Sequence, residues 1–461
     1  MNFLKKIFVP TILVISFLLL LYTFYKSEIV WDGNNRKYYK PYYLIFSTLI
    51  FFSISFHFVN QKFKEYIIIS AITIFVSLYF LEAFLIYSKN SLKNKLSREE
   101  ILKNKLYENQ TGKKWDRRSK LEIYKKLKKS ATIGVFPNQY LYRAKYSIFP
   151  LSSISNYRTI HCNENGYYSI YHSDRYGFNN PDSEWDKKEI DYLLIGDSFT
   201  HGACVNRPND IGSVIRSLSN KTVLNLGQSG NGPIIEYATL REYLSRNVKN
   251  VLWIYYRNDL DDLINEKKWG NNILLKYLND SNYKQNLKSK QNTIDDLAFN
   301  FIKEKEAIVA QHKSLQYVQF IKLYNLRDKI SQATVKKQFK NTLSIIPQTD
   351  LSTVSEFKEI IQLAKEYVEK NNSKFYFVYL PGYLNYRNYK DKNYSFEENN
   401  NNYNLIKTTV KELKIPFIDI HKEVFAKEKN PLIFFPFELS AHYNIKGYKK
   451  VAETIYKFTK D

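Results

Sequence analysis

The sequence predicts a doubly wound, flavodoxin-like α/β domain with a parallel sheet, preceded by three transmembrane helices. In the C-terminal half of the 461-residue chain, short continuous apolar runs alternate with amphipathic stretches. Such runs fit strands that are buried on both faces of a parallel sheet, and the stretches between them fit crossover helices. Long uncharged apolar segments near the N-terminus are typical of helices that cross a bilayer.

The N-terminal part contains three apolar runs. Residues 7–25 and 42–59 carry no Lys, Arg, Asp or Glu, and residues 66–87 carry Glu82 as their only charge. About 20 consecutive apolar residues suffice to span the hydrocarbon core of a membrane. We therefore expect residues 1–88 to form three transmembrane helices.

A signal peptide is the alternative interpretation of the first run, because Lys5 and Lys6 precede it. No small-residue cleavage site precedes Lys26, and two more apolar runs follow, so we favour retained helices. The distribution of Lys and Arg around the three runs mildly favours a cytoplasmic C-terminal part.

The remaining chain divides into three regions of different composition. Residues 89–135 are basic and helical in pattern, which predicts a stalk or linker. Residues 136–461 are expected to form the α/β domain, beginning with Tyr-, Asn- and Pro-rich turns. Within this domain, residues of about 264–350 show no strand pattern, and we interpret them as a helical insertion between the third and fourth strands.

Five apolar runs are the expected strands of the sheet, and polar residues follow the first three of them. Ligands bind at the carboxyl ends of the strands in doubly wound sheets. Ser198, Gly230 and Asn258 all stand just past such ends, which predicts a site at this edge. The five runs are residues 192–195, 222–226, 251–256, 374–380 and 417–420.

Four short motifs at these positions resemble the SGNH (GDSL-type) hydrolase family. The resemblance covers residues of about 190–458, with the motifs in the order that the family has. It implies a serine ester hydrolase that needs no cofactor and no metal, acting on an acyl ester. The motifs are Gly196-Asp197-Ser198-Phe199, Ser229-Gly230-Asn231, Asn258-Asp259, and His442 followed by Asn444 and Gly447.

The resemblance assigns a role to each matching residue. Ser198 is the expected nucleophile and His442 its base, since a serine hydroxyl needs an adjacent base to become reactive. The expected oxyanion donors are the N–H groups of Ser198 and Gly230 and the amide of Asn258. The expected supporting residues are Asp197, Asp259 and Glu438.

Structural roles are the alternatives for these same residues. Ser198 is also a suitable helix cap, Asn258 and Asp259 also fit a turn, and His442 also fits a surface histidine. His201, His421 and His57 carry no catalytic signal in the sequence. We expect His201 to be a loop residue and His421 to be structural.

Two positions depart from the family pattern. Tyr256 stands where the family usually has a glycine, and Leu439 stands where the family has the aspartate that orients the histidine. Glu438 or Ser440 is the expected substitute, and a Ser–His dyad oriented by a backbone carbonyl is the alternative. The absence of an aspartate at position 439 also favours a non-enzymatic hypothesis, in which the domain is degenerate and binds a partner without catalysis.

Cys162 and Cys204 are the only cysteines, and no Cys/His spacing resembles a zinc site. They are a possible disulfide, which would hold the preceding loop against the helix of Ser198. A disulfide indicates an oxidising compartment. With the resemblance to membrane-tethered bacterial members, this favours an inner-membrane protein whose catalytic domain is extracytoplasmic, against the weak charge distribution.

The formal net charge is +24, and no nucleic-acid-binding motif accompanies it. The expected partners are the bilayer and an acyl-ester substrate. An acylated glycan is one candidate for this substrate. Two activities share these residues: an esterase, in which water attacks the acyl-enzyme, and an O-acyltransferase or deacetylase acting on cell-surface polysaccharide. The sequence does not decide between them.

Overall fold

The computed structural model describes most of the chain, which divides into two compact units. The first unit comprises residues Met1–Lys95 and Lys313–Thr342, and the second comprises Leu96–His312 and Leu343–Asp461. The end of the expected insertion, residues 330–350, lies outside the described residues. The described residues are 2–33, 36–94, 97–128, 130–141, 146–270, 272–329, 351–391, 394–397 and 401–460.

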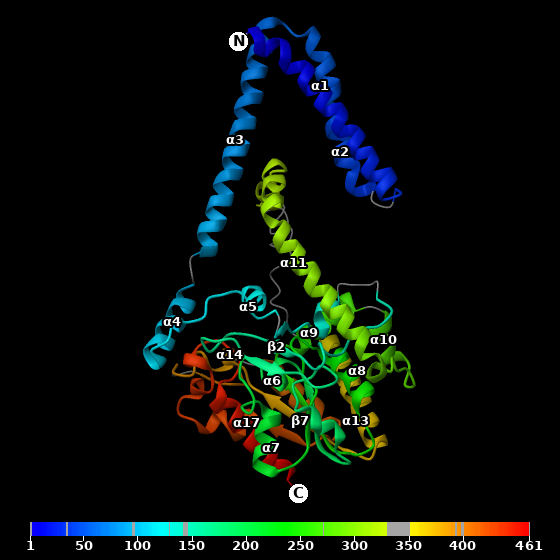
Figure 1. Cartoon of the computed structure of the whole chain (residues 1–461), viewed down its shortest axis with the longest axis vertical. Helices are drawn as coiled ribbons and strands as arrows, with labels where there is room; N and C mark the ends of the chain where they lie inside the picture. The colour runs from blue at the N-terminus through cyan, green and yellow to red at the C-terminus, as the bar shows by residue number, and fades with distance from the viewer. Residues whose placement is uncertain are drawn as a thin grey trace. The chain divides into compact units, whose positions relative to one another are not determined.

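Long helices dominate the first unit. They are α1 (Asn2–Phe24), α2 (Arg36–Ser55) and α3 (Gln61–Asn94), and α1 packs along α2 and contacts α3 (Figure 1). Two segments, Ile7–Val30 and Gln61–Ser88, are long and apolar enough to cross a membrane, with mean hydropathies of 2.5 and 2.2. Short helices η1 (Tyr25–Val30) and η2 (Phe56–Phe58) follow α1 and α2.

The sequence predicts three membrane-spanning helices, and among the described residues the structure has two helices that are long and apolar enough. The second apolar run, residues 42–59, does not lie within one helix, because α2 ends at Ser55 and a 3₁₀ turn follows. The first turns of α2 are polar, beginning at Arg36, which forms an ion pair with Glu28. These two features leave α2 without a sufficiently long apolar stretch.

Glu82, the single charge of the third apolar run, is fully buried in the first unit. Its carboxylate accepts hydrogen bonds from the backbone N–H groups of Asn325 and Leu326 at 2.9 and 2.8 Å. Free N–H groups at the start of a helical segment are suitable partners for a carboxylate. The buried charge of Glu82 is therefore satisfied within this unit.

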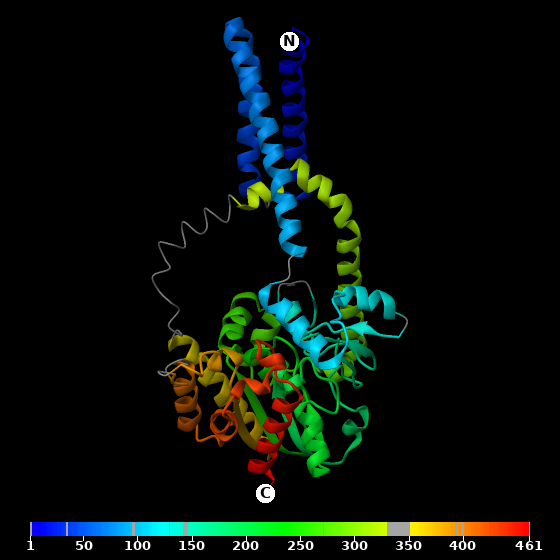
Figure 2. The same ribbon diagram turned by 90° about the vertical axis from the view of Figure 1, so that its left-hand side faces the viewer.

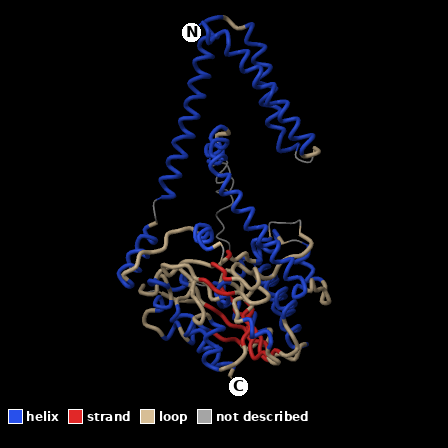
Figure 3. The backbone as a smooth tube through the Cα atoms, viewed as in Figure 1, coloured by secondary structure: helices blue, strands red, loops and turns tan. Residues whose placement is uncertain are grey.

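The second unit is built around a parallel sheet of five strands in the order β5-β4-β6-β7-β8. All five predicted strands are present, and the strands are drawn in red in Figure 3. This order is that of flavodoxin-like doubly wound sheets. The strands are β4 (Ile190–Gly196), β5 (Val223–Asn225), β6 (Val248–Tyr256), β7 (Lys374–Leu380) and β8 (Phe417–Asp419).

The strands form because their side chains are buried on both faces. In β6, for example, the neighbours Trp253 and Ile254 are both fully buried although they point to opposite sides of the sheet. The main helices around the sheet pack against one another in two groups. In the first group, α7 (Ile211–Ser219) contacts α17 (Ile445–Thr459). The second group consists of α8 (Pro233–Tyr243), α9 (Asp259–Trp269) and α13 (Leu351–Lys370) (Figure 1).

Most of the expected stalk of residues 89–135 belongs to the second unit, whereas residues 89–94 form the end of α3 in the first unit. Its helices α4 (Arg98–Thr111) and α5 (Lys120–Leu127) each begin with a capping box, formed by Ser97 with Glu100 and by Ser119 with Glu122. Ile123 and Tyr124 of α5 belong to the hydrophobic core. Figure 2 shows both helices, in cyan, against the rest of this unit.

The described part of the insertion is helical, as the sequence predicts. Between α9 and α13 lie α10 (Asn272–Asn279), η5 (Leu287–Lys290) and the long helix α11 (Gln291–Ile321). A small three-stranded sheet of β1 (Thr132–Ile133), β2 (Arg158–Ile160) and β3 (Ile170–His172) precedes the main sheet. The remaining elements are η3 (Pro137–Tyr140), η4 (Asp182–Asp186), α6 (Ser198–His201), α14 (Tyr383–Tyr386), α15 (Asn401–Glu412), α16 (Ile420–Glu423), η6 (Phe425–Lys427), η7 (Pro431–Phe434) and η8 (Pro436–Glu438).

Gly177→Ala tests the turn that leads into the main sheet. Gly177 has φ +80°, and a Cβ there would overlap the carbonyl oxygen of Ser153. We expect a loss of roughly 2–4 kcal/mol in the free energy of unfolding, from backbone strain and steric overlap together. Gly112→Ala is the matched control, because Gly112 has φ +68° with open space around it and should lose only about 1 kcal/mol. Equal losses in denaturant unfolding of the two variants would contradict the steric account.

Candidate active site

Ser198 is placed by the tight turn that joins β4 to α6. Asp197 caps this short helix, and its carboxylate accepts the backbone N–H of Phe199 at 2.8 Å. A Cβ on Gly196 would lie 2.6 Å from the carbonyl oxygen of Ile254, so only glycine allows β4 to approach β6 this closely at the strand end. As a result, the half-buried Ser198 hydroxyl stands at the carboxyl edge of the sheet.

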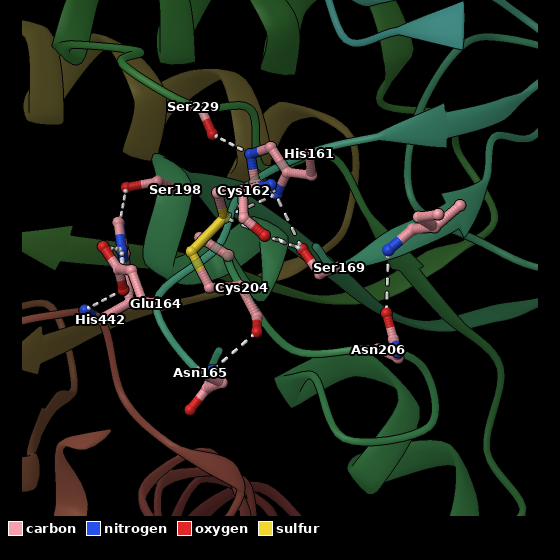
Figure 4. Close-up of a disulfide and its surroundings, with 12 residues drawn as sticks. His161, Cys162, Glu164, Asn165, Ser169, Ser198, Cys204, Asn206, Ser229 and His442 are labelled. Carbon is pink, nitrogen blue, oxygen red and sulfur yellow. Dashed lines mark hydrogen bonds and ion pairs between the residues drawn. A yellow bond between two sulfur atoms is a disulfide. The ribbon is translucent and has the colours of Figure 1, made fainter. Parts of the chain in front are cut away.

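His442 reaches the same edge from the segment before α17. Asn444 caps α17 by accepting the N–H of Gly447 at 3.0 Å, which fixes the start of the helix two residues after His442. Nε2 of His442 lies 2.8 Å from Oγ of Ser198, although the two residues are 244 positions apart in the sequence. The imidazole is therefore within hydrogen-bond reach of the hydroxyl (Figure 4).

The carboxylate that contacts His442 is Glu164, which the sequence analysis did not identify. Both of its oxygens lie 3.0 Å from Nδ1 of His442, and Oε2 also accepts the backbone N–H of His442 at 2.7 Å. Ser198, His442 and Glu164 thus form a continuous relay (Figure 4). A carboxylate in this place sets the tautomer of the ring and stabilises its charged form.

Glu438 and Ser440, the expected substitutes, do not orient His442. Glu438 is exposed on η8, and no hydrogen bond joins either side chain to the imidazole. The backbone carbonyl of Ser440 accepts instead from Lys103 at 2.7 Å. The dyad interpretation with a carbonyl as orienting group is also replaced, because Glu164 occupies Nδ1.

The charges in this relay shift two pKa values in opposite directions. Burial alone acts to lower the pKa of His442, but the negative charge and hydrogen bond of Glu164, with the charge of Asp197, raise it. Burial acts to raise the pKa of Glu164, and the charge of His442 outweighs it, so that this pKa is lowered. Glu164 is therefore a carboxylate at neutral pH, as an orienting group must be.

Two further groups at this edge are candidate oxyanion donors. Gly230 has φ +75°, and any side chain there would meet Asn138. Asn258 follows β6, and its amide nitrogen donates one hydrogen bond to Asp262 at 2.5 Å, which leaves its second N–H. Asp259 accepts the backbone N–H of Tyr256 at 3.2 Å and so holds this strand end.

Tyr256, the first departure from the family pattern, packs against the nucleophile turn. Its ring stacks on Phe199 with 4.0 Å between the centroids, and the ring of Phe199 lies 4.7 Å from that of His442. The aromatic ring therefore fills the place that a glycine leaves open.

The loop that carries Glu164 is held by three attachments. Cys162 and Cys204 form a disulfide, with 5.1 Å between their Cα atoms (Figure 4). The side-chain amide of Asn165 donates to the carbonyl of Cys204 at 2.8 Å, and that of Asn163 donates to the carbonyl of Asp116 at 2.9 Å. Two of the three attachments join this loop to Cys204, six residues after Ser198.

The other histidines of the second unit have different surroundings. His201 ends α6 and is buried with no hydrogen bond to either ring nitrogen among the described residues, and burial lowers its pKa to about 3. His421 lies 2.8 Å from the hydroxyl of Tyr386, and burial lowers its pKa to about 4. Nε2 of His161 lies 2.7 Å from the hydroxyl of Ser229, beside Gly230 (Figure 4). The side chain of His57 lies outside the described residues.

One group of potential metal ligands lies at this site. Atoms of Glu164, Cys204 and His442 are within 4.8 Å of one another. The sulfur of Cys204 is bonded to Cys162, and Glu164 and His442 bind each other, so this group does not fit a metal ion.

No protein-family model and no curated protein matches this sequence. A solved structure named as a lipolytic protein of the G-D-S-L family from Desulfitobacterium hafniense DCB-2 is similar over 58% of this chain and 99% of its own, with 14% identity and a TM-score of 0.31. An acetyl xylan esterase is similar over 58% and 99%, with 14% identity and a TM-score of 0.33. At such scores these likenesses carry no weight for function, which is argued from the geometry of the site.

Glu164→Gln tests which carboxylate acts on His442. We expect kcat of ester hydrolysis to fall by about 10²–10⁴. The rate requires neutral His442 and is lost as pH falls through its pKa. Without the charge that raises this pKa, the acid limb of the pH–rate profile should move to lower pH. Glu438→Gln is the matched control and should leave the profile in place. A shift with Glu438→Gln instead would contradict the role of Glu164.

The double variant Cys162→Ala/Cys204→Ala tests the attachment of the loop. We expect kcat/KM to fall by roughly 10- to 100-fold, because small misplacements of a catalytic group are costly. Made in the Glu164→Gln background, the same change should have little further effect, since the group that it positions is already gone. If the cysteine change lowers kcat/KM by the same factor with and without Glu164→Gln, the disulfide acts on stability rather than on Glu164.

Proposed function

We propose that this protein is a membrane-anchored serine ester hydrolase in which Ser198, His442 and Glu164 form the catalytic triad. The observation that carries the proposal is the relay of hydrogen bonds from Ser198 Oγ to His442 Nε2 at 2.8 Å and from Nδ1 to Glu164 at 3.0 Å. In this arrangement the base can take the proton of the serine hydroxyl as the oxygen attacks a substrate, and the acid keeps the base in the required orientation.

The reaction follows from the positions of these groups. Oγ of Ser198 attacks the ester carbonyl while Nε2 of His442 takes its proton. The oxyanion that forms is stabilised by the N–H groups of Ser198 and Gly230 and by the free N–H of Asn258, each contributing about 10²–10³ in rate. His442 then gives its proton to the leaving alcohol. Water attacks the acyl group on Ser198 while His442 takes a proton from it, the bond between the acyl carbon and Oγ breaks, and His442 returns the proton to Oγ as the carboxylic acid leaves.

A degenerate, non-catalytic domain is disfavoured by the same geometry. That hypothesis rests on Leu439, which stands where the family has the aspartate that orients the histidine. Glu164 supplies an acid from another part of the chain, bonded to both Nδ1 and the backbone N–H of His442. Transfer of the acyl group to a sugar hydroxyl would use the same acyl-enzyme, and analysis of the products with water and with a polysaccharide acceptor separates the two activities.

The two apolar helices support attachment to a membrane, because both are long enough to span it. The disulfide supports an oxidising compartment for the catalytic unit. We therefore propose an inner-membrane protein with an extracytoplasmic catalytic unit, in preference to the orientation that the charge distribution favours.

Labelling with a fluorophosphonate probe tests the proposed nucleophile. We expect the full-length protein in detergent to be labelled stoichiometrically, Ser198→Ala to be unlabelled, and His442→Ala to react at least 10²-fold more slowly. Ser440→Ala, which removes an exposed serine near His442, is the control and should label like the wild type. A folded wild-type protein that does not react would overturn the hydrolase proposal.

A further inference from the structure

A small polar pocket lies at the carboxyl edge of the sheet, beyond β6 and β7. Its volume is about 230 Å³, and among the described residues no carboxylate lines it. The lining residues are Arg257, Leu384, Asn385, Arg387, Asn388 and Tyr394.

Both arginines of this pocket lack a hydrogen-bonding or ion-pair partner in the part of the chain that the structure describes. Among the described residues, neither Arg257 nor Arg387 forms an ion pair or a hydrogen bond, whereas Arg118 and Arg175 each bind carboxylates through their guanidinium groups. Arg257 is half-buried, so that its charge is partly removed from water without an internal partner. Such a site favours the binding of an anion.

Asn385 adds a fixed amide to the pocket. It is 3% exposed, and its carbonyl oxygen accepts the backbone N–H of Gly382 at 2.7 Å. This hydrogen bond fixes the orientation of the amide and leaves its NH₂ group without a partner among the described residues. The described lining of the pocket thus offers hydrogen-bond donors from the side chains of Arg257, Arg387 and Asn385, and it includes no negatively charged side chain.

The pocket adjoins one strand end of the proposed active site. Arg257 immediately precedes Asn258, a candidate oxyanion donor, and its neighbour Tyr256 stacks on Phe199. The aliphatic part of the Arg257 side chain also approaches the segment after β7. The Cδ atom of Arg257 lies 3.2 Å from the position that a Cβ on Gly382 would take. Because β6 lies between β4 and β7 in the sheet, the strand end that precedes Arg257 neighbours the strand end that precedes Ser198.

We propose that this pocket binds an anionic group, a carboxylate or a phosphate, on the substrate whose ester Ser198 cleaves. The inference rests on the proposed hydrolase function and narrows its substrates to acidic esters. Guanidinium groups match the planar oxygen pairs of carboxylates and phosphates, and paired arginines bind them through several donors at once. The net charge of +24 favours the approach of such substrates over long range.

Hydrolysis of a charged and a neutral ester by the full-length protein tests this proposal. We would compare acetylated galacturonate oligomers with acetylated xylan oligomers, and take the ratio of their kcat/KM values. The wild type should prefer the galacturonate ester, and Arg257→Gln/Arg387→Gln should lower the ratio by roughly 10- to 100-fold. Lys390→Gln, which removes an exposed charge on the same segment outside the pocket, should leave the ratio unchanged. A double variant with the wild-type ratio overturns the proposal.

A binding measurement separates this inference from the hydrolase proposal. Calorimetry with the Ser198→Ala protein would use deacetylated galacturonate oligomers and, separately, inorganic phosphate. Binding of either ligand that is lost in the double arginine variant supports the pocket even if no ester is cleaved, and shows which anion it prefers. Absence of binding by both ligands overturns the inference, while labelling of Ser198 still decides the hydrolase function.

Discussion

The parallel pairing of β4 with β6 is the constraint on which the site depends. Gly196 at the end of β4 stands opposite Ile254 of β6, so the turns after both strands open at one edge. Ser198 follows the first turn and Asn258 the second, and a slip of one residue would turn the side chains of a strand to the other face. The close approach at Gly196 maintains this register, because a side chain there would meet the backbone of β6.

The hydrogen-bonded group at the candidate site draws its three members from different parts of the second unit. Ser198 belongs to the sheet, His442 to the segment before the last helix, and Glu164 to a loop that precedes the sheet in sequence. The glutamate lies 278 residues before the histidine that it contacts. Such long-range contacts close only when the whole unit is folded, which links formation of the site to global stability.

Much of this architecture was predictable from the sequence, and the exceptions have physical causes. Apolar runs gave all five strands, since burial on both faces leaves a clear pattern. Strand ends directed attention to Ser198 and Asn258. Glu164 was missed because its loop lies outside the alternation of strands and helices. A signal existed, however: it stands two residues after Cys162, whose possible bond to Cys204 placed it near Ser198. The apolar content of residues 42–59 was misleading because composition does not show that α2 ends at Ser55.

The disulfide between Cys162 and Cys204 also bears on when the loop of Glu164 is fully attached. It joins segments that are 42 residues apart and lie on either side of the nucleophile, and no other cysteine is available for exchange. During synthesis in a reducing environment the two thiols stay separate, and the glutamate loop keeps only its hydrogen bonds. Without the bond, one of the attachments that place Glu164 beside His442 is missing. Oxidation of the two thiols restores this attachment, so that the redox state of the surroundings acts on the position of Glu164 through one covalent bond.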